Sequence, residues 1–193
     1  MRNAIFLDRD GTINIDEEGY IAKREDFKIF DFAKEAIELA SDYLLFIVSN
    51  QSGIARGYFD INDLEMVHAE MNKQLGGEKF AEILFSPFHP DGKIEKYAKV
   101  SQTRKPGIKL FKKALQEYNF KINDSFMIGD KMSDIEFGKN AGLQTILVLT
   151  GHGKYVFENR ENWNIKPDYV VKNVLVAIKL IKKINRKSDL SSG

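Results

Sequence analysis

The feature of this sequence that most constrains its fold is the alternation of short apolar runs with amphipathic helical patterns. Residues 4–7, 44–48 and 145–149 carry no charge and are too short for helices, which is typical of strands buried on both faces. Weaker strand patterns occupy residues 83–85, 125–128 and 169–171, and helical patterns occupy residues 32–41, 62–75, 108–118, 134–141 and 174–184. Parallel strands need crossover helices, so the sequence predicts an α/β fold: a Rossmann-like parallel sheet with helices on both faces.

Length and composition narrow the class of protein. The 193 residues fit one domain, expected over residues 1–185, with a polar and disordered tail at 186–193. The 29 basic and 28 acidic residues leave a net charge of +1, which gives no reason to expect a nucleic-acid partner. No run approaches the roughly 18 apolar residues of a membrane span, and without cysteine there is no disulfide or thiolate metal site. We therefore expect a cytoplasmic protein that binds neither nucleic acid nor membrane.

Two polar connections interrupt the alternation, at residues 15–31 and 87–105. Both are longer than connections in compact domains usually are, but neither is long enough for a folded cap domain. We therefore expect an open site, with exposed carboxylates at its rim.

Polar side chains follow the predicted strands at one edge of the sheet, where open parallel sheets bind ligands. These residues are Asp8, Asp10, Ser49, Asn50, Gln51, Asp130 and Lys131, and Lys105 stands just before a predicted helix. Asp8 and Asp10 lie at alternate positions, where their charges repel each other, and folding does not require this. The pair therefore predicts a bound cation, or a group that needs both a nucleophile and a proton donor.

Four motifs, in this order, resemble those of the haloacid dehalogenase-like phosphatases. They are LDRDGT at residues 7–12, the apolar strand ending in Ser49, Lys105 before Pro106, and IGDKMSD at residues 128–134. The resemblance covers most of the chain and implies a haloacid dehalogenase-like fold without a cap domain.

The resemblance also implies a chemical role for each motif. Asp8 would attack phosphorus and become an aspartyl phosphate, while Asp10 would protonate the leaving oxygen and later take a proton from water. Asp8, Asp130 and the backbone carbonyl of Asp10 would hold Mg2+. Ser49 and Lys105 would hold the phosphoryl oxygens. Relatives that move ions have threonine in place of Asp10, so the aspartate implies hydrolysis of the intermediate.

Several residues have a second interpretation. The DxDG of residues 8–11 could belong to a calcium loop, but that loop follows a helix and has glycine at its sixth position. Asp134 could support the metal site or cap the following helix, and Lys131 could contact phosphate or be an exposed cation. His68 is expected on the solvated surface, and His152 in a loop without a catalytic role.

Further stretches resemble a capless subgroup, the bacterial D-glycero-D-manno-heptose-1,7-bisphosphate 7-phosphatases, which is shared with the histidinol-phosphate phosphatases. The stretches are NIDEEGY at residues 14–20, SNQSGIARGYF at 49–59 and TRKPGI at 103–108. The subgroup implies removal of the 7-phosphate during synthesis of nucleotide-activated heptose for lipopolysaccharide or another surface glycan. The residues that would contact this small sugar phosphate are Asp16, Glu17, Gly19, Tyr20, Ser49, Asn50, Gln51, Ser52, Arg104, Lys105 and Lys131.

Arg104 favours the bisphosphate among the possible substrates. Its fork of donors suits a second phosphate, whereas the far end of histidinol phosphate is cationic. The alternatives are a phosphatase for histidinol phosphate or another small metabolite, a silent relative that binds a sugar phosphate, and a nucleic-acid 3'-phosphatase, which the charge balance disfavours. No large apolar stripe is left unassigned, so we expect a monomer.

One departure from the subgroup is large. Its members usually carry a zinc loop, Cys-x-His followed by Cys-x-Cys, and the aligned positions here are Ser86, Phe88, Ser101 and Thr103. None supplies the thiolate or imidazole that zinc prefers, and His89 alone cannot hold the ion. We expect the loop at 87–102 to be ordered by packing, through Phe88 and Tyr97, or to be mobile.

We predict that elemental analysis of the purified protein will find no stoichiometric zinc, because the aligned loop offers no zinc-binding set. A zinc-selective chelator should accordingly leave the melting temperature unchanged. One equivalent of zinc per chain would contradict the alignment.

Overall fold

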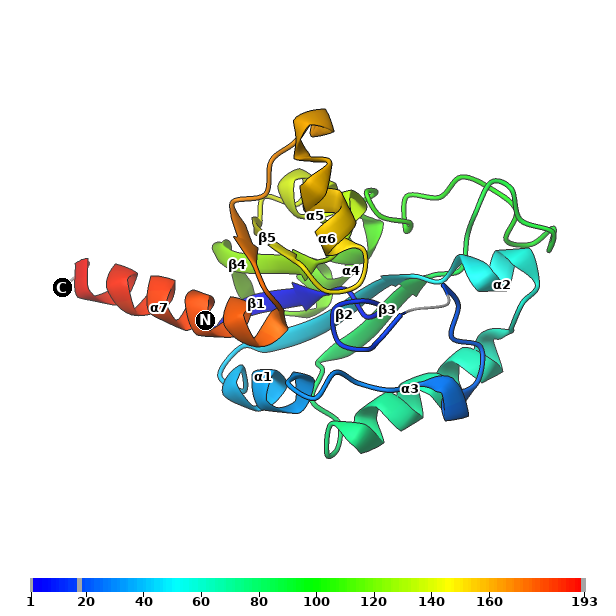
Figure 1. Cartoon of the computed structure of the whole chain (residues 1–193), viewed down its shortest axis with the longest axis horizontal. Helices are drawn as coiled ribbons and strands as arrows, with labels where there is room; N and C mark the ends of the chain where they lie inside the picture. The colour runs from blue at the N-terminus through cyan, green and yellow to red at the C-terminus, as the bar shows by residue number, and fades with distance from the viewer. Residues whose placement is uncertain (1, 17–18, 192–193) are drawn as a thin grey trace.

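The computed structural model describes residues 2–16 and 19–191, which form a six-stranded sheet (Figure 1). The strands are β1 (Arg2–Leu7), β2 (Leu44–Asn50), β3 (Glu82–Ser86), β4 (Phe120–Gly129), β5 (Gln144–Val148) and β6 (Tyr169–Val171). Their order is β3-β2-β1-β4-β5-β6, and every neighbouring pair is parallel. The predicted parallel sheet is therefore confirmed.

Helices cover both faces of the sheet. They are α1 (Ala33–Leu39), α2 (Ser52–Arg56), α3 (Ile61–Gln74), α4 (Lys109–Glu117), α5 (Met132–Asn140), α6 (Gly153–Glu158) and α7 (Val174–Ser191). One face packs against α1, α3 and α7, and the other against α4 and α5. Figure 1 shows α1 and α3 below the sheet, and α4 and α5 above it.

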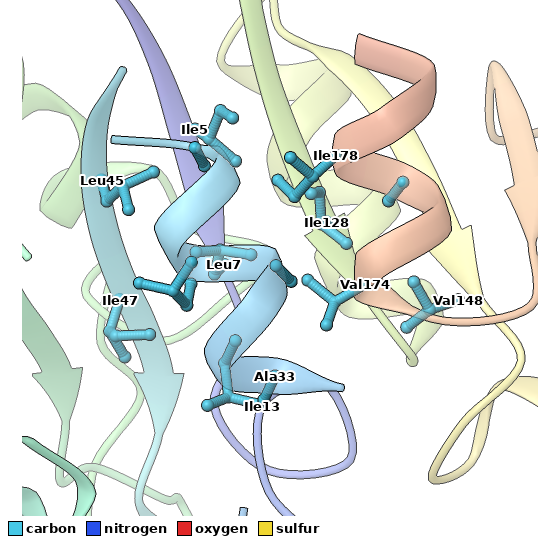
Figure 2. Close-up of a cluster of buried hydrophobic side chains, with 14 of the residues drawn as sticks. Ile5, Leu7, Ile13, Ala33, Leu45, Ile47, Ile128, Val148, Val174 and Ile178 are labelled. Carbon is cyan, nitrogen blue, oxygen red and sulfur yellow. The ribbon is translucent and has the colours of Figure 1, made fainter. Parts of the chain in front are cut away.

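Strand β1 lies inside the sheet because its side chains alternate between two apolar layers. Ile5 and Leu7 pack with residues of α1 and α7, as Figure 2 shows. Phe6 points into the opposite layer, where its ring stacks on Phe46 at a centroid distance of 4.8 Å. All of these side chains are fully buried, and each such burial contributes about 1.5–3 kcal/mol. Packing on both faces therefore fixes the strand that leads into Asp8.

The chain changes direction across the sheet at β1. It runs outward from β1 through β2 to β3, and then returns past β1 to β4 on the other side. A crevice forms at such a point, beyond the carboxyl ends of the two strands, and ligands bind there. Leu7 pairs with Ile128 at this end, and the Asp8 N–H donates to the Ile128 carbonyl over 2.9 Å. The crevice between β1 and β4 is therefore where the candidate site should form.

The boundaries of some elements differ from the sequence patterns. Strand β4 begins at Phe120 instead of residue 125, because its polar first half pairs with the start of β1 across a register shift. The sequence patterns do not show α2 and α6, since helices of five and six residues are too short for a hydrophobic period. Helix α7 continues to Ser191, beyond residue 185 where the patterns end the domain.

Neither long connection forms a cap domain. In the described residues, the segment between β1 and α1 contains one short 3-10 helix, Arg24–Asp26, and the segment between β3 and α4 contains neither helix nor strand. The capless fold expected from the sequence is confirmed. Among the described helices, none has the length and apolar character needed to cross a membrane.

Candidate active site

Three buried carboxylates meet in the crevice between β1 and β4. Asp8 follows β1, Asp130 follows β4, and Asp134 lies in the first turn of α5. Each offers one oxygen that lies within 4.8 Å of the other two. Asp8 is 4% exposed and the other two are fully buried. The expectation of exposed rim carboxylates is therefore wrong, because the loops and α5 close over the strand ends.

Clustering changes the acidity of these carboxyl groups. Burial, with the charge of Asp8 as the next cause, raises the pKa of Asp130 to about 8, while Lys131 opposes the shift. Burial also raises the pKa of Asp8, against the opposing charge of Lys105. Carboxylates crowded in this way share a need for positive charge.

The donor set fits a hard divalent cation such as Mg2+. All available donors are oxygens, as that class of ion prefers. Asp130 Oδ2 accepts a hydrogen bond from the His152 N–H over 2.7 Å, but the buried Asp130 Oδ1 has no donor. An unsatisfied buried oxygen is costly, and a bound cation would satisfy it. Asp8 and Asp130 are the side chains that could hold such an ion.

Two glycines make room for Asp130. Gly11 has φ +81° and Gly151 has φ +53°, both in the left-handed region that favours glycine. A Cβ at either position would lie 2.3 Å from Asp130 Oδ2. The glycine that follows Asp10 in LDRDGT therefore serves both the turn after β1 and the close approach of a carboxylate.

Lys105 supplies positive charge from within the cluster. Its Nζ lies 2.8 Å from Asp8 Oδ1 and 2.7 Å from Asp134 Oδ1, and it donates to the Val48 carbonyl over 2.6 Å. Burial alone would lower the pKa of Lys105, but Asp134 and Asp8 raise it. Asn50 fixes the lysine backbone by accepting from its N–H over 2.9 Å and donating to its carbonyl over 3.1 Å. A phosphoryl contact would require the ammonium to exchange one of these partners.

Asp134 makes the capping contact that the sequence left open, and it also pairs with Lys105. Its Oδ2 accepts from the Lys131 N–H over 2.9 Å at the start of α5, which is a helix-capping contact. Its Oδ1 pairs with Lys105. The cap therefore also orients the lysine.

Asp10 is held differently from Asp8. Arg9 donates to both of its oxygens, Nε to Oδ1 over 2.9 Å and Nη2 to Oδ2 over 3.0 Å. Asn14 adds a donor to Oδ1 at 3.1 Å, and Gln51 adds one to Oδ2 at 2.8 Å. Burial would raise the pKa of Asp10, but the Arg9 charge and these hydrogen bonds lower it. Asp10 is thus an ionised carboxylate with four donors.

Arg9 is the residue that the sequence patterns missed. Its side chain is fully buried, with the guanidinium 6.0 Å from the centre of the Phe27 ring. His68 is buried nearby, and burial together with the Arg9 charge lowers its pKa to about 3. The expected surface position of His68 is therefore wrong. The position of Arg9 between the two aspartates was visible in the sequence, but the sequence alone does not show that the Arg9 side chain is buried.

Ser49 is arranged to donate a hydrogen bond into the site. Its Oγ accepts from Gln51 Nε2 over 2.6 Å, which leaves the hydroxyl hydrogen for a ligand. A small hollow of about 30 Å³ opens beside it. The residues that line the hollow are Asp8, Asp10, Ser49, Asn50, Lys105, Lys131, Ser133 and Asp134. The hollow brings together side chains from four separate segments, as the sheet-edge prediction requires.

Among the remaining predicted substrate contacts that the structure describes, Lys131 alone is in the lining of this hollow. Lys131 is 3.8 Å from Asp16, and the Tyr20 hydroxyl is 3.3 Å from Ser52 Oγ. Arg104 Nη1 donates to the Phe88 carbonyl over 3.4 Å. Gly19 has φ +87° and no atom near the place of a Cβ, and Glu17 lies outside the described residues.

Hydroxyl groups occupy three of the four positions aligned with zinc ligands, and Phe88 occupies the fourth. Thr103 Oγ1 lies 3.0 Å from Ser86 Oγ and 2.8 Å from Ser101 Oγ. Beside them, the Phe88 and Tyr97 rings pack edge-on with centroids 5.8 Å apart. The loop therefore has its own polar and aromatic contacts, including the expected aromatic pair.

This chain is similar to a known family and to curated proteins. Residues 102–177 match the family model of HAD-hydrolase-like proteins. A D-glycero-D-manno-heptose-1,7-bisphosphate 7-phosphatase from Chlorobaculum tepidum is 38% identical over 183 residues, 90% of this chain and 91% of that protein. A D-glycero-beta-D-manno-heptose-1,7-bisphosphate 7-phosphatase from Pasteurella multocida is 40% identical over 187 residues, 94% of this chain and 98% of that protein.

A solved structure agrees with the fold. The D,D-heptose 1,7-bisphosphate phosphatase from B. bronchiseptica, complexed with magnesium and phosphate, superposes with a TM-score of 0.82 at 24% identity. The match covers 94% of this chain and 98% of that one. The chain belongs to the haloacid dehalogenase-like hydrolases and, within them, to the heptose bisphosphate phosphatase family.

We predict that Arg9→Lys will keep the positive charge but lose the two N–H donors that hold the Asp10 carboxylate in position. An acid that protonates the leaving group matters for an alkyl phosphate and much less for p-nitrophenyl phosphate, which leaves as a stable anion. We expect kcat/KM to fall about tenfold or more for the alkyl phosphate, with a far smaller loss for the aryl phosphate.

Arg24→Lys is the matched control, because Arg24 pairs with its neighbour Glu25 over 2.9 Å on the exposed surface. This substitution should leave kcat/KM unchanged for both the alkyl and the aryl phosphate. Equal losses with both substrates in Arg9→Lys would contradict a role through Asp10.

We also predict that Mg2+ will raise the melting temperature more at pH 8.5 than at pH 6. The metal-free folded protein keeps a proton on Asp130 up to its pKa of about 8, so its stability from that group falls as pH rises from about 4 to 8. Mg2+ must displace this proton at pH 6 but not at pH 8.5. Differential scanning fluorimetry measures both shifts.

Asp130→Asn should reduce the pH dependence of the Mg2+ effect, since the amide does not titrate and Asp8 alone then remains as a titrating side chain that could hold the ion. Equal Mg2+ shifts at the two pH values in the unmodified protein would be evidence against cation binding at Asp130.

Proposed function

We propose that this protein is a Mg2+-dependent phosphatase that removes the 7-phosphate of D-glycero-D-manno-heptose 1,7-bisphosphate through an aspartyl phosphate on Asp8. One observation carries the proposal. Asp8, whose Oδ1 lies 2.8 Å from Lys105 Nζ, and Asp130, whose buried Oδ1 has no hydrogen-bond donor, lie close enough for both to hold one cation. The names of the relatives from Chlorobaculum tepidum and Pasteurella multocida support the substrate.

Asp8 is the nucleophile in this proposal. Lys105 holds its Oδ1, which leaves Oδ2 to attack phosphorus. The bond from phosphorus to the sugar oxygen breaks as the bond to Asp8 forms. Ser49 donates its hydroxyl hydrogen to a phosphoryl oxygen, and Lys131 at the edge of the hollow adds positive charge.

Asp10 moves the protons. It is ionised with four donors, so it must give up a donor and take up a proton before it can protonate the leaving oxygen. A phosphate monoester with a second pKa near 6 can bring that proton as the monoanion. Once the sugar has left, the ionised Asp10 accepts a proton from the water that attacks the aspartyl phosphate, and Asp8 and inorganic phosphate are released.

The residues that would hold Mg2+ are Asp8 and Asp130, with the backbone carbonyl of Asp10. When bound, the ion supplies the positive charge that lets a carboxylate approach a phosphate dianion.

The proposal includes the setting of the reaction. A monomer with a single domain over residues 1–185 is part of the proposal, because the sequence leaves no large apolar stripe unassigned. We propose a small sugar phosphate as the substrate and the cytoplasm as the location. The near balance of acidic and basic residues gives no reason to expect binding to nucleic acid or to a membrane surface.

A panel of phosphorylated substrates tests the function. With Mg2+, kcat/KM should be higher for heptose 1,7-bisphosphate than for histidinol phosphate, and phosphate release should stop when Mg2+ is removed. A preference for histidinol phosphate would contradict the proposed substrate.

Asp8→Asn should lower kcat by about a thousandfold or more while the protein stays folded. The substitution is isosteric and removes the charge of one of three crowded acidic groups, so the melting temperature should hold or rise. Equal trace activities in the variant and the unmodified protein would contradict catalysis by Asp8 and favour a silent, ligand-binding relative.

A further inference from the structure

One nitrogen of Arg9 and one nitrogen of His68 have no hydrogen-bond partner in the part of the chain that the structure describes. Arg9 donates through Nε and Nη2 to Asp10 and through Nη2 to Gln51, but its buried Nη1 has no acceptor. His68 lies on α3, and its buried Nε2 is also unpaired. Arg9 is fully buried and His68 is 9% exposed. Unpaired polar atoms at this depth are uncommon in folded proteins, so each one requires a physical reason.

The fold brings these two side chains to the same side of the site. The Arg9 guanidinium lies over the ring of Phe27, which packs in the apolar layer that α3 covers. The centre of the His68 ring lies 6.1 Å from that of Phe85, and Phe85 is paired with Ser49 at the end of β2. Arg9 therefore extends from the reaction centre toward α3, and His68 extends from α3 toward the strand ends.

The charges of the site act on His68. Burial and the charge of Arg9 lower the pKa of His68 to about 3, while Asp10 opposes the shift. The imidazole is therefore neutral, with one N–H donor and one acceptor nitrogen. A lone pair is attracted to a neighbouring cation, whereas an N–H is repelled by it. The charge of Arg9 thus favours the lone pair on Nε2, the buried nitrogen, and the hydrogen on Nδ1.

The turn after β1 contains further unpaired atoms close to Arg9. The buried Thr12 Oγ1 and Asn14 Oδ1 have no hydrogen-bond partner, and the Thr12 and Asn14 N–H groups both donate to the Arg9 carbonyl. Internal water molecules typically make about three hydrogen bonds to polar groups of this kind. A water that accepts from Arg9 Nη1 has two hydrogens to donate, one to His68 Nε2 and one to an oxygen of the turn.

We propose that His68 is a positioning residue, whose Nε2 accepts a hydrogen bond from Arg9 Nη1 through one internal water molecule and so holds the guanidinium against Asp10. The inference rests on the proposed function, because it acts through the proton transfers assigned to Asp10. Among the described residues, those that line the hollow at Asp8 do not include His68. His68 therefore affects the reaction only through Arg9.

Two substitutions at His68 test the role in catalysis. His68→Leu removes the acceptor and keeps a side chain of similar size. We expect kcat/KM to fall about fivefold for the sugar phosphate that the enzyme hydrolyses best, and to stay within about twofold for p-nitrophenyl phosphate, whose leaving group needs no acid. His68→Gln places an amide oxygen near the position of Nε2, so it should restore kcat/KM to within about twofold of the unmodified enzyme.

Other results with these variants would overturn the inference. They are an equal loss with both substrates in His68→Leu, no loss with the sugar phosphate in His68→Leu, and a His68→Gln enzyme as impaired as His68→Leu. A merely structural role for His68 predicts the first of these results, because damage to the fold affects both substrates.

Asn72→Leu is the matched control. Asn72 lies one turn after His68 on α3, and its buried Oδ1 also has no hydrogen-bond partner. Since α3 leads into the start of β3, Asn72 is further from the strand ends where the site forms. This substitution also replaces a polar side chain of α3 by leucine, and it should leave kcat/KM unchanged for both substrates.

Nitrogen-15 NMR of protein labelled at histidine tests the link to Arg9 without turnover. The chain has three histidines, and the signals missing from His68→Gln identify those of His68. We expect hydrogen on Nδ1 and none on Nε2, and an Nε2 signal that moves in Arg9→Lys but not in Arg24→Lys. Hydrogen on Nε2, or an Nε2 signal that Arg9→Lys does not move, would refute the inference even if the proposed activity is found.

These measurements separate failure of the inference from failure of the proposed function. If Arg9→Lys affects the two substrates differently and His68→Leu does not, the inference fails and the proposed role of Asp10 stands. If neither variant distinguishes the substrates, the role of Asp10 fails, and the NMR signal of His68 decides whether His68 positions Arg9.

Discussion

The repulsion among Asp8, Asp130 and Asp134 in a buried crevice is the interaction on which the rest of the site depends. Like charges in a place of low polarity persist only when positive charge and hydrogen bonds are supplied at close range. The Lys105 ammonium supplies part of that charge, and the Asn50 side chain fixes the lysine backbone. The sheet supplies the rest of the order, because packed layers on both faces of β1 prevent the strand ends from moving apart.

Two aspartates separated by one residue have opposite environments. Asp8 is buried among carboxylates, and its pKa is raised, whereas Asp10 is surrounded by donors, and its pKa is lowered. Neighbouring carboxyl groups whose acidities are pushed apart are suited to different tasks. Arg9 creates much of the difference, since its guanidinium donates to both oxygens of Asp10 and lowers the pKa of that group.

The sheet and the meeting of Asp8 with Asp130 could be predicted from the sequence, because uncharged runs identify buried strands and parallel strands bring their polar ends to one edge. The inward turn of Arg9 and the burial of His68 could not, since both depend on how α3 and the loop after β1 close over the sheet. The double role of Asp134 was open for a similar reason: a capping residue next to a site has two oxygens, and only the packed structure shows where each one points.

The loop between β3 and α4 is tied by hydroxyl contacts among Ser86, Ser101 and Thr103 and by the Phe88–Tyr97 contact. Alcohols and aromatic rings are indifferent to peroxide and to scavenging of trace metals, unlike thiolates. Residues 86–103 contain neither cysteine nor methionine, so peroxide finds no sulfur to oxidise in this loop, and loss of zinc would remove no ligand contact from it.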